Sequence, residues 1–147
     1  KILFDDKDYT DLPQKFIKDN IGFILQDSLL FDDTIINNIR YGKQNATEEE
    51  VINVCKKIGL HAFIEEMPNK YSTKVGEGGL LLSNGQKQLI AFARVLLKNP
   101  DIIILDEATS SVDSLTERLI QNCINNLKII CIKFFIHNIN ISNFFSF

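Results

Sequence analysis

The sequence predicts an α/β fold built on a parallel sheet, and three kinds of pattern indicate it. In the C-terminal half, an apolar run, a helical repeat and a second apolar run follow one another at 102–105, 114–127 and 129–136. This order is typical of a strand–helix–strand unit with parallel strands. The run Ile102–Leu105 is entirely apolar, as expected of a parallel strand that is buried on both faces. Upstream, serine or threonine followed three residues later by glutamate or glutamine marks helix starts.

The N-terminal segment is predicted to contain short elements. Ile2–Phe4 has strand composition and leads into a polar turn. A short helix is expected over Leu12–Lys18, with Pro13 near its first turn, where a fixed φ is tolerated. Ile21–Leu25 is an apolar run of strand length that ends at Gln26.

A helical region is expected to follow. Thr47 and Glu50 form a capping box that predicts a helix start, and Gly59 is expected to end that helix. The apolar residues on its one predicted face are Val51, Val54, Cys55 and Ile58. A second short helix is expected over His61–Met67, closed by Pro68.

Two further helices are predicted from capping boxes. The first begins at Ser83, with Gln86 completing the box, and ends at Asn99–Pro100. Its expected buried residues are Leu89, Ala93, Leu96 and Leu97. The second starts at Ser114, with Glu117 completing the box. Its expected apolar stripe consists of Leu115, Leu119, Cys123, Ile124 and Leu127.

The composition is that of an ordinary globular chain and excludes some functions. A length of 147 residues is enough for one domain with a sizeable core. The formal net charge of −3 gives no basic footprint, so we do not expect a nucleic-acid partner. The cysteines lack a CxxC spacing and are expected to be buried free thiols: Cys55, Cys123 and Cys131. Ile129–Phe147 is interrupted by polar residues, so no transmembrane helix is expected. The chain starts at Lys1 without a targeting signal, which suggests a fragment.

The first candidate site is a pair of acids, Asp106 and Glu107, directly after the predicted strand Ile102–Leu105. Ligands of parallel sheets bind beyond the carboxyl ends of the strands. There, one carboxylate can hold Mg²⁺ and the other can polarise a water molecule. The alternative is a solvated acidic turn. Gln26, just past another strand end, is a weaker candidate of the same kind.

The second candidate site is the loop Leu82–Gln86, which reads LSNGQ. Gly85 allows the backbone to approach a ligand, while Ser83 and the free N–H groups of the new helix can hold an anion. The alternative is an ordinary helix cap.

Together these motifs resemble the nucleotide-binding domain of ABC transporters. The resemblance rests on FILQD at 23–27, LSNGQKQ at 82–88 and ILDEATSSVD at 104–113, in this order and spacing. It covers roughly Lys1 to Leu127, with a fainter extension to His137. It implies part of a P-loop NTPase-like ABC ATPase fold, with a parallel sheet core and an inserted helical subdomain. The chain then reads as one partial domain, 1–147. Its segments are 1–26 up to the Q-loop, 27–98 as helical subdomain with the signature motif, 99–137 with Walker B, D-loop and switch strand, and an atypical tail, 138–147.

The resemblance also implies roles for individual residues. Asp106 matches the Walker B aspartate that, with Gln26 of the Q-loop, supports Mg²⁺. Glu107 matches the catalytic glutamate, and His137 the switch histidine. The residues implied to contact ATP are Gln26, Ser83, Asn84, Gly85 and Gln86, with Asp113 in the D-loop. In the family, the signature loop contacts ATP that is bound mainly by the opposite subunit.

The implied function is hydrolysis of ATP, with Mg²⁺, coupled to export across a membrane. The implied partners are a second nucleotide-binding domain in a head-to-tail dimer and the transmembrane domain of the same transporter. Gln26–Gly42 and Val75–Glu77 are similar to exporters of the B subfamily, which includes the mitochondrial iron–sulfur and heavy-metal group. The domain would then face the cytosol or the mitochondrial matrix. Two alternatives stay open: a soluble ABC ATPase acting on ribosomes or DNA, and a catalytically inactive fragment or regulatory domain.

The sequence departs from the family pattern at several positions. No GxxxxGK[ST] loop occurs in these residues, and we expect it upstream of Lys1. Asn84 replaces a glycine, and because asparagine tolerates a left-handed backbone the loop is expected to survive. Leu89 replaces an arginine. After the expected switch histidine, Asn138 replaces an arginine, and Ile139–Phe147 resembles nothing in the family.

Overall fold

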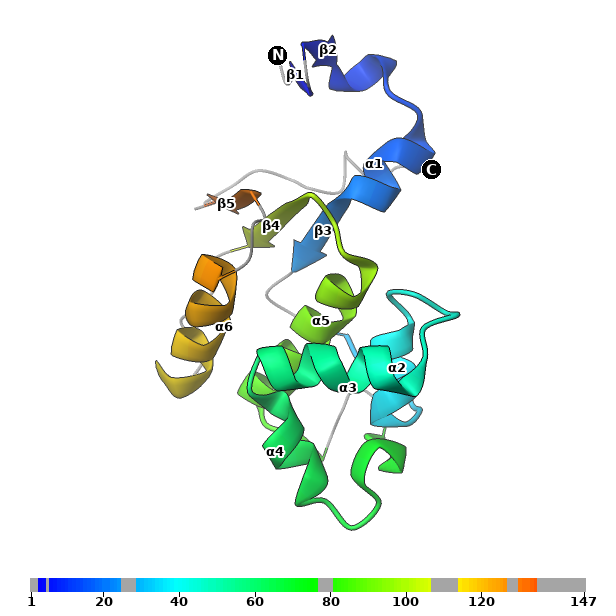
Figure 1. The fold of residues 1–147 in the computed structure, drawn as a ribbon, viewed down its shortest axis with the longest axis vertical. Helices are drawn as coiled ribbons and strands as arrows, with labels where there is room; N and C mark the ends of the chain where they lie inside the picture. The colour runs from blue at the N-terminus through cyan, green and yellow to red at the C-terminus, as the bar shows by residue number, and fades with distance from the viewer. Residues whose placement is uncertain are drawn as a thin grey trace.

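A parallel sheet lies at the centre of the α/β part of the molecule. The computed structural model describes residues 3–4, 6–24, 29–76, 81–106, 114–126 and 130–134. Within these residues, the strands β3 (Ile21–Ile24), β4 (Ile102–Asp106) and β5 (Ile130–Phe134) pair in the order β3-β4-β5, all parallel. The predicted α/β class is therefore confirmed, and helices cover the sheet as Figure 1 shows.

The register brings the carboxyl ends of the three strands to one edge of this sheet. Ile24 at the end of β3 pairs with Leu105 of β4, and Asp106 at the end of β4 pairs with Phe134 of β5. Close packing behind the sheet depends on Gly22, because a Cβ there would meet Cγ1 of Val95 at 2.3 Å. The helix that carries Val95 is thus held directly against β3.

The N-terminal segment differs from its prediction. The strand β1 (Leu3–Phe4) pairs antiparallel with β2 (Lys7–Asp8), so the expected polar turn in fact ends in a second short strand. A 3₁₀ turn, η1 (Tyr9–Asp11), follows, and its cap is the Asp8 carboxylate, which accepts from Thr10 N–H at 3.1 Å. The helix α1 (Gln14–Asn20) starts later than expected, because Pro13 caps it with an extended backbone.

Short helices form the second part of the molecule, below the sheet in Figure 1. They are α2 (Ile35–Arg40), α3 (Glu48–Lys57), α4 (Leu60–Glu65) and the 3₁₀ turn η2 (Lys70–Ser72). The box predicted at Thr47 is confirmed: Glu50 N–H donates to its Oγ1 at 3.2 Å, and Glu50 Oε2 accepts from Thr47 N–H at 2.8 Å. Gly59 ends this run as predicted, with a left-handed φ of 75°.

The helix α5 (Asn84–Lys98) joins the two parts, because it packs against α2, α3 and α4 on one side and against β3 and α6 on the other. Its four predicted buried residues are all buried, Leu89 included, so leucine suits that position. Burial extends further than one face, and Ile90 and Phe92 are fully buried. The helix ends at Asn99, as predicted, in a left-handed conformation with φ 55°.

The helix α6 (Ser114–Asn126) begins at Ser114, as predicted. Ser114 is the first helical residue and not the cap, so the predicted box with Glu117 is wrong. The predicted stripe is confirmed at Cys123, which is buried, and at Leu119, which packs against the core, but it is wrong at Leu115, which is 66% exposed. Thr116 and Ile120 are also buried. Leu127 and the Ile124 side chain lie outside the described residues.

One continuous core links both parts, from Ile24 and Ile103 of the sheet to Ile120 of α6 and the helices around α5. Cys55 and Cys123 are buried free thiols, as predicted, whereas the Cys131 side chain lies outside the described residues. Within the described ranges, no helix has the length and apolar character that would let it cross a membrane.

Candidate functional site

The N-terminus of α5 presents the loop residues that the sequence singles out. Ser83 caps the helix: its Oγ accepts from Gln86 N–H at 3.2 Å, and Gln86 Oε1 accepts from Ser83 N–H at 2.9 Å. Ser83 and Asn84 are exposed, whereas Gly85 is buried. The box uses the N–H groups of Ser83 and Gln86 and leaves those of Asn84 and Gly85 outside it. A helix N-terminus with such N–H groups carries partial positive charge and favours an anion.

Asn84 does not adopt the left-handed backbone that we expected to explain its replacement of glycine. It is the first residue of α5 and has a right-handed helical backbone. The non-glycine residues with positive φ in the described part of the chain are Asp6, Lys70 and Asn99. The replacement therefore needs no special backbone tolerance, because a helical φ suits asparagine as it suits other L-residues, without strain.

The sheet edge carries the second group of candidates. Asp106 is the last residue of β4 and lies in register with the end of β5. Gln26, Glu107, Asp113 and His137 lie outside the described residues. In the chain, Gln26 follows β3, Glu107 follows β4 and His137 follows β5. Asp113 lies in the connection between β4 and α6. Among the described residues, no group of three or more His, Cys, Asp or Glu side chains could hold a metal ion.

Sequence reasoning missed a third feature, a polar cluster centred on Arg94 of α5. Its Nε donates to the Asn38 carbonyl at 2.9 Å, Nη1 to the Leu29 carbonyl at 3.1 Å, and Nη2 to Asn38 Oδ1 at 3.3 Å. Burial lowers the pKa of this guanidinium. A lone arginine between buried residues of an otherwise apolar helix was the signal that could have identified it.

Asn38 of α2 is fully buried and uses both ends of its amide. Oδ1 accepts from Phe31 N–H at 2.8 Å, and Nδ2 donates to the carbonyls of Phe31 and Thr34, both at 3.0 Å. A buried amide that is fully hydrogen-bonded fixes its neighbours, because any displaced group would lose its partner without gaining water. Asn38 therefore fixes the backbone at Phe31 and Thr34, just before α2.

An exposed apolar surface lies next to this cluster, and we call it the docking face: Leu29, Phe31 and Tyr41. These side chains are 76%, 43% and 58% exposed. The rings of Phe31 and Tyr41 stack with centroids 4.1 Å apart and planes 20° from parallel. The guanidinium carbon of Arg94 lies 5.4 Å from the centroid of the Phe31 ring.

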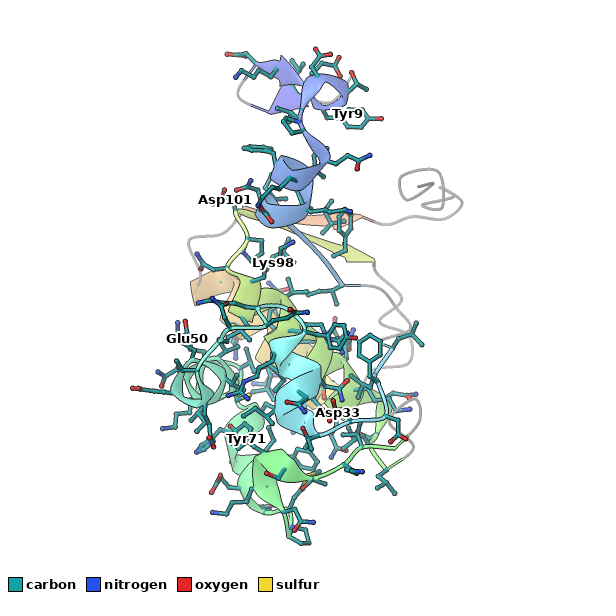
Figure 2. The ribbon with its side chains drawn as sticks, turned by 90° about the vertical axis from the view of Figure 1, so that its right-hand side faces the viewer. Tyr9, Asp33, Glu50, Tyr71, Lys98 and Asp101 are labelled. Carbon is teal, nitrogen blue, oxygen red and sulfur yellow. The ribbon has the colours of Figure 1, made fainter. Side chains whose placement is uncertain are left out.

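Backbone hydrogen bonds also join the two exporter-like stretches, which lie far apart in the chain. Val75 N–H donates to the Asp33 carbonyl at 3.1 Å, and Ile35 N–H donates to the Thr73 carbonyl at 3.0 Å. Thr34 and Lys74 form an antiparallel bridge between these bonds. Glu77 lies outside the described residues. Figure 2 shows Asp33 on the helical part, away from Lys98 and Asp101 beside the sheet.

A buried polar group between α3, α4 and η2 has a structural rather than a chemical character. Cys55 hydrogen-bonds to Tyr71, and burial raises the pKa of the Cys55 thiol to about 11. Burial also raises the pKa of Tyr71, whose hydroxyl lies 2.9 Å from Nδ1 of His61. A neutral thiol and a neutral phenol are poor nucleophiles, so this group stabilises the helical part.

The comparisons with known proteins identify the class. A family model described as ABC transporter matches residues 1–110. The chain belongs to the ABC transporter family.

The relatives define the type more narrowly. The chain is 45% identical over 127 residues to "Iron-sulfur clusters transporter ATM1, mitochondrial" of Gibberella zeae, a match that covers 86% of this chain and 18% of the relative. It is 52% identical over 116 residues to "ABC transporter B family member 4" of Dictyostelium discoideum, covering 79% and 15%. A solved structure of a bacterial Atm1-family ABC exporter with ATP bound matches with TM-score 0.82 and 40% identity, covering 89% of this chain and 23% of that one. The chain thus spans less than a quarter of these relatives, and its matched region corresponds to the ATP-binding domain of B-subfamily exporters. The resemblance drawn from the sequence is confirmed.

Proposed function

We propose that this chain supplies part of an ATP-hydrolysing site that drives export across a membrane. The observation that carries the proposal is the alignment of three parallel strand ends at one sheet edge. Asp106 is the last residue of its strand, and Gln26, Glu107 and His137 come within three residues after the strand ends in the chain. Phosphoryl transfer needs mainly positioned charges and an oriented water, and one edge with an amide, two carboxylates and an imidazole can provide them.

The donor set at this edge fits Mg²⁺, because hard oxygen ligands such as carboxylate and amide oxygens suit that ion. Asp106 and Gln26 would hold it. When bound, Mg²⁺ neutralises charge on the phosphate oxygens during transfer. Glu107 would orient the attacking water, and His137 would contact the transferred phosphate.

The N-terminus of α5 would contact the phosphates of ATP held mainly by a second nucleotide-binding domain. Its exposed cap, Ser83 and Asn84, supports such a contact, since a phosphate can reach the free N–H groups without moving the helix. Asp113 would join the two sites across the dimer. The working unit is then a head-to-tail pair that encloses two ATP molecules.

The docking face, Leu29, Phe31 and Tyr41, would receive the transmembrane domain of the same transporter. Large exposed apolar side chains gathered on one face are typical of protein contacts. The backbone pairing of Val75 with Asp33 supports a single face that includes both exporter-like stretches. The domain would lie on the cytosolic or matrix side of its membrane.

The test is Glu107→Gln in the full-length parent protein. Removing a positioned base is expected to lower ATP turnover at least about 100-fold while Mg·ATP binding persists. Turnover is measured by phosphate release, and binding by filter retention of labelled ATP. The matched control is Glu117→Gln, the same change at an exposed residue of α6.

Unchanged turnover in Glu107→Gln would remove Glu107 from the catalytic role. Absence of turnover in the unmodified parent would favour the alternative of a catalytically inactive domain.

A further inference from the structure

We propose that Arg94 and Asn38 couple the docking face to the N-terminus of α5, so that segment 29–42 and the loop Ser83–Gln86 move as one rigid body. Arg94 is then a positioning residue, through which contact with the transmembrane partner and binding of the nucleotide affect each other. The inference rests on the proposed function and adds to it a named mechanical link.

The guanidinium of Arg94 binds segment 29–42. The guanidinium donates to three oxygens of segment 29–42: the carbonyls of Leu29 and Asn38 and the Asn38 amide oxygen. A planar guanidinium presents its donors in a fixed fork, so it fixes direction as well as distance. Arg94 therefore holds the backbone of that segment at two points, nine residues apart in the chain.

Asn38 links Phe31 to Arg94 and so completes the hydrogen-bonded cluster. Its Oδ1 accepts both from Phe31 N–H and from Arg94 Nη2, at 2.8 and 3.3 Å. Movement of Phe31 relative to α5 must break at least one of these part-buried bonds. The loss is costly because Asn38 is fully buried, so water replaces the lost partner of its amide oxygen poorly.

At the other end of segment 29–42, the backbone of Gly42 lies close to the backbone of α5. A Cβ on Gly42 would meet the carbonyl oxygen of Arg94 at 1.9 Å. The C-terminal end of segment 29–42 thus lies against the backbone of Arg94. The side chain of the same residue binds the Leu29 carbonyl at the N-terminal end of the segment. One end is hydrogen-bonded to Arg94 and the other is in close backbone contact with it, so movement of the segment relative to α5 is restricted at both ends.

The cluster of Arg94 and Asn38, which we call the clamp, connects the docking face with the N-terminus of α5. Phe31 belongs to the docking face, stacks on Tyr41 and lies beneath the Arg94 guanidinium, so a force on the face reaches Arg94 directly. From Arg94 a continuous α-helix runs to Ser83, over roughly 16 Å at 1.5 Å per residue. A hydrogen-bonded helix of this length moves as a rigid element, so displacement at one end appears at the other.

A nucleotide-free experiment tests the rigidity. Spin labels are attached at Asp32→Cys, on the exposed start of the segment, and at Lys87→Cys on α5 of the full-length parent. With Arg94 intact we expect one narrow distance distribution, and in Arg94→Met a distribution at least about twice as wide, because the fork is lost. Arg40→Met is the matched control, since Arg40 also donates to a backbone carbonyl, that of Ala46, but within the helical part alone. Arg94→Lys keeps the charge without the fork and is expected to widen the distribution as well.

A second experiment tests the transmission, by hydrogen exchange in the Glu107→Gln background with Mg·ATP as the probe. With Arg94 intact, Mg·ATP is expected to slow exchange at least about tenfold both at 83–88 and at 29–42. In Arg94→Met the slowing at 83–88 persists, and exchange at 29–42 stays within about twofold of the nucleotide-free rate. A purely structural role would instead change both segments together, or neither.

An unchanged narrow distance in Arg94→Met, or an unchanged response of 29–42 to Mg·ATP, would overturn the coupling. If Mg·ATP fails to slow exchange at 83–88 while Arg94 is intact, the proposed nucleotide contact fails instead. The spin-label distances then still decide whether the clamp exists.

Discussion

At the scale of single residues, two polar side chains and one glycine organise the helical part around α5. Asn38 is completely buried and Arg94 largely so, yet neither would be chosen for an interior by its chemistry alone. They are accommodated because their polar atoms meet backbone groups that would otherwise lie buried without partners. Gly42 makes this arrangement possible by letting two backbones touch.

We expect Gly42→Ala to lower the free energy of unfolding by about 3 kcal/mol, because its Cβ would meet the carbonyl oxygen of Arg94, a backbone atom that cannot move aside cheaply. Urea unfolding of the parent's ATP-binding domain measures the change. Gly76→Ala is the control: a Cβ there meets nothing within 4 Å, so only its left-handed φ of 73° contributes, at about 1 kcal/mol. An effect at Gly42 no larger than that at Gly76 would show that α2 and α5 can separate freely.

At the scale of elements, helix starts were predictable where a capping box lies in the sequence, at Thr47 and Ser83. Such boxes are local, since they need only four consecutive residues, and tertiary contacts rarely displace them. For α6, the start and the stripe residues Leu119 and Cys123 were predictable, but Leu115 at the edge of the stripe was wrong, because packing against other elements decides which edge is buried. Leu119 is the α6 residue that Gly59 admits, since a Cβ there would lie 3.0 Å from its Cδ2.

We expect Thr47→Ala to destabilise the ATP-binding domain by about 1 kcal/mol, because Glu50 N–H would lose its cap. Thr47→Ser retains the hydroxyl and should restore most of the stability. ATP turnover per folded molecule of the parent should stay unchanged, since Thr47 lies on α3, outside the proposed site. Equal stability of the alanine and serine variants would mean that the box contributes nothing to α3.

At the scale of the whole molecule, the proposed site has two separate parts, and the fold of this chain alone does not complete it. The sheet edge would hold the metal and the water, and the end of α5 would serve a second domain. The backbone cradle that a GxxxxGK[ST] loop provides for phosphates does not occur in these 147 residues.

We therefore expect the isolated 147 residues to show no measurable Mg²⁺-dependent ATPase activity, because without that cradle ATP is not held against the sheet edge. Phosphate release and equilibrium dialysis with labelled ATP measure the activity and the binding. The full-length parent, assayed in parallel, is the positive control. Robust turnover by the isolated chain would sink this expectation and would require another phosphate-binding element within it.

The sequence by itself determined the parallel α/β class, the capped helices and the family, because these follow from local periodicity and from motifs of a few consecutive residues. It also supplied the candidate residues Gln26, Asp106 and Glu107, each at the end of an apolar run. Only the tertiary structure decided the strand order β3-β4-β5, the burial of Asn38 and the link from Arg94 to segment 29–42. The physical reason is that these features join residues far apart in the chain, as Arg94 and Leu29 are. Hydrogen bonds between such residues leave no periodic trace in either segment.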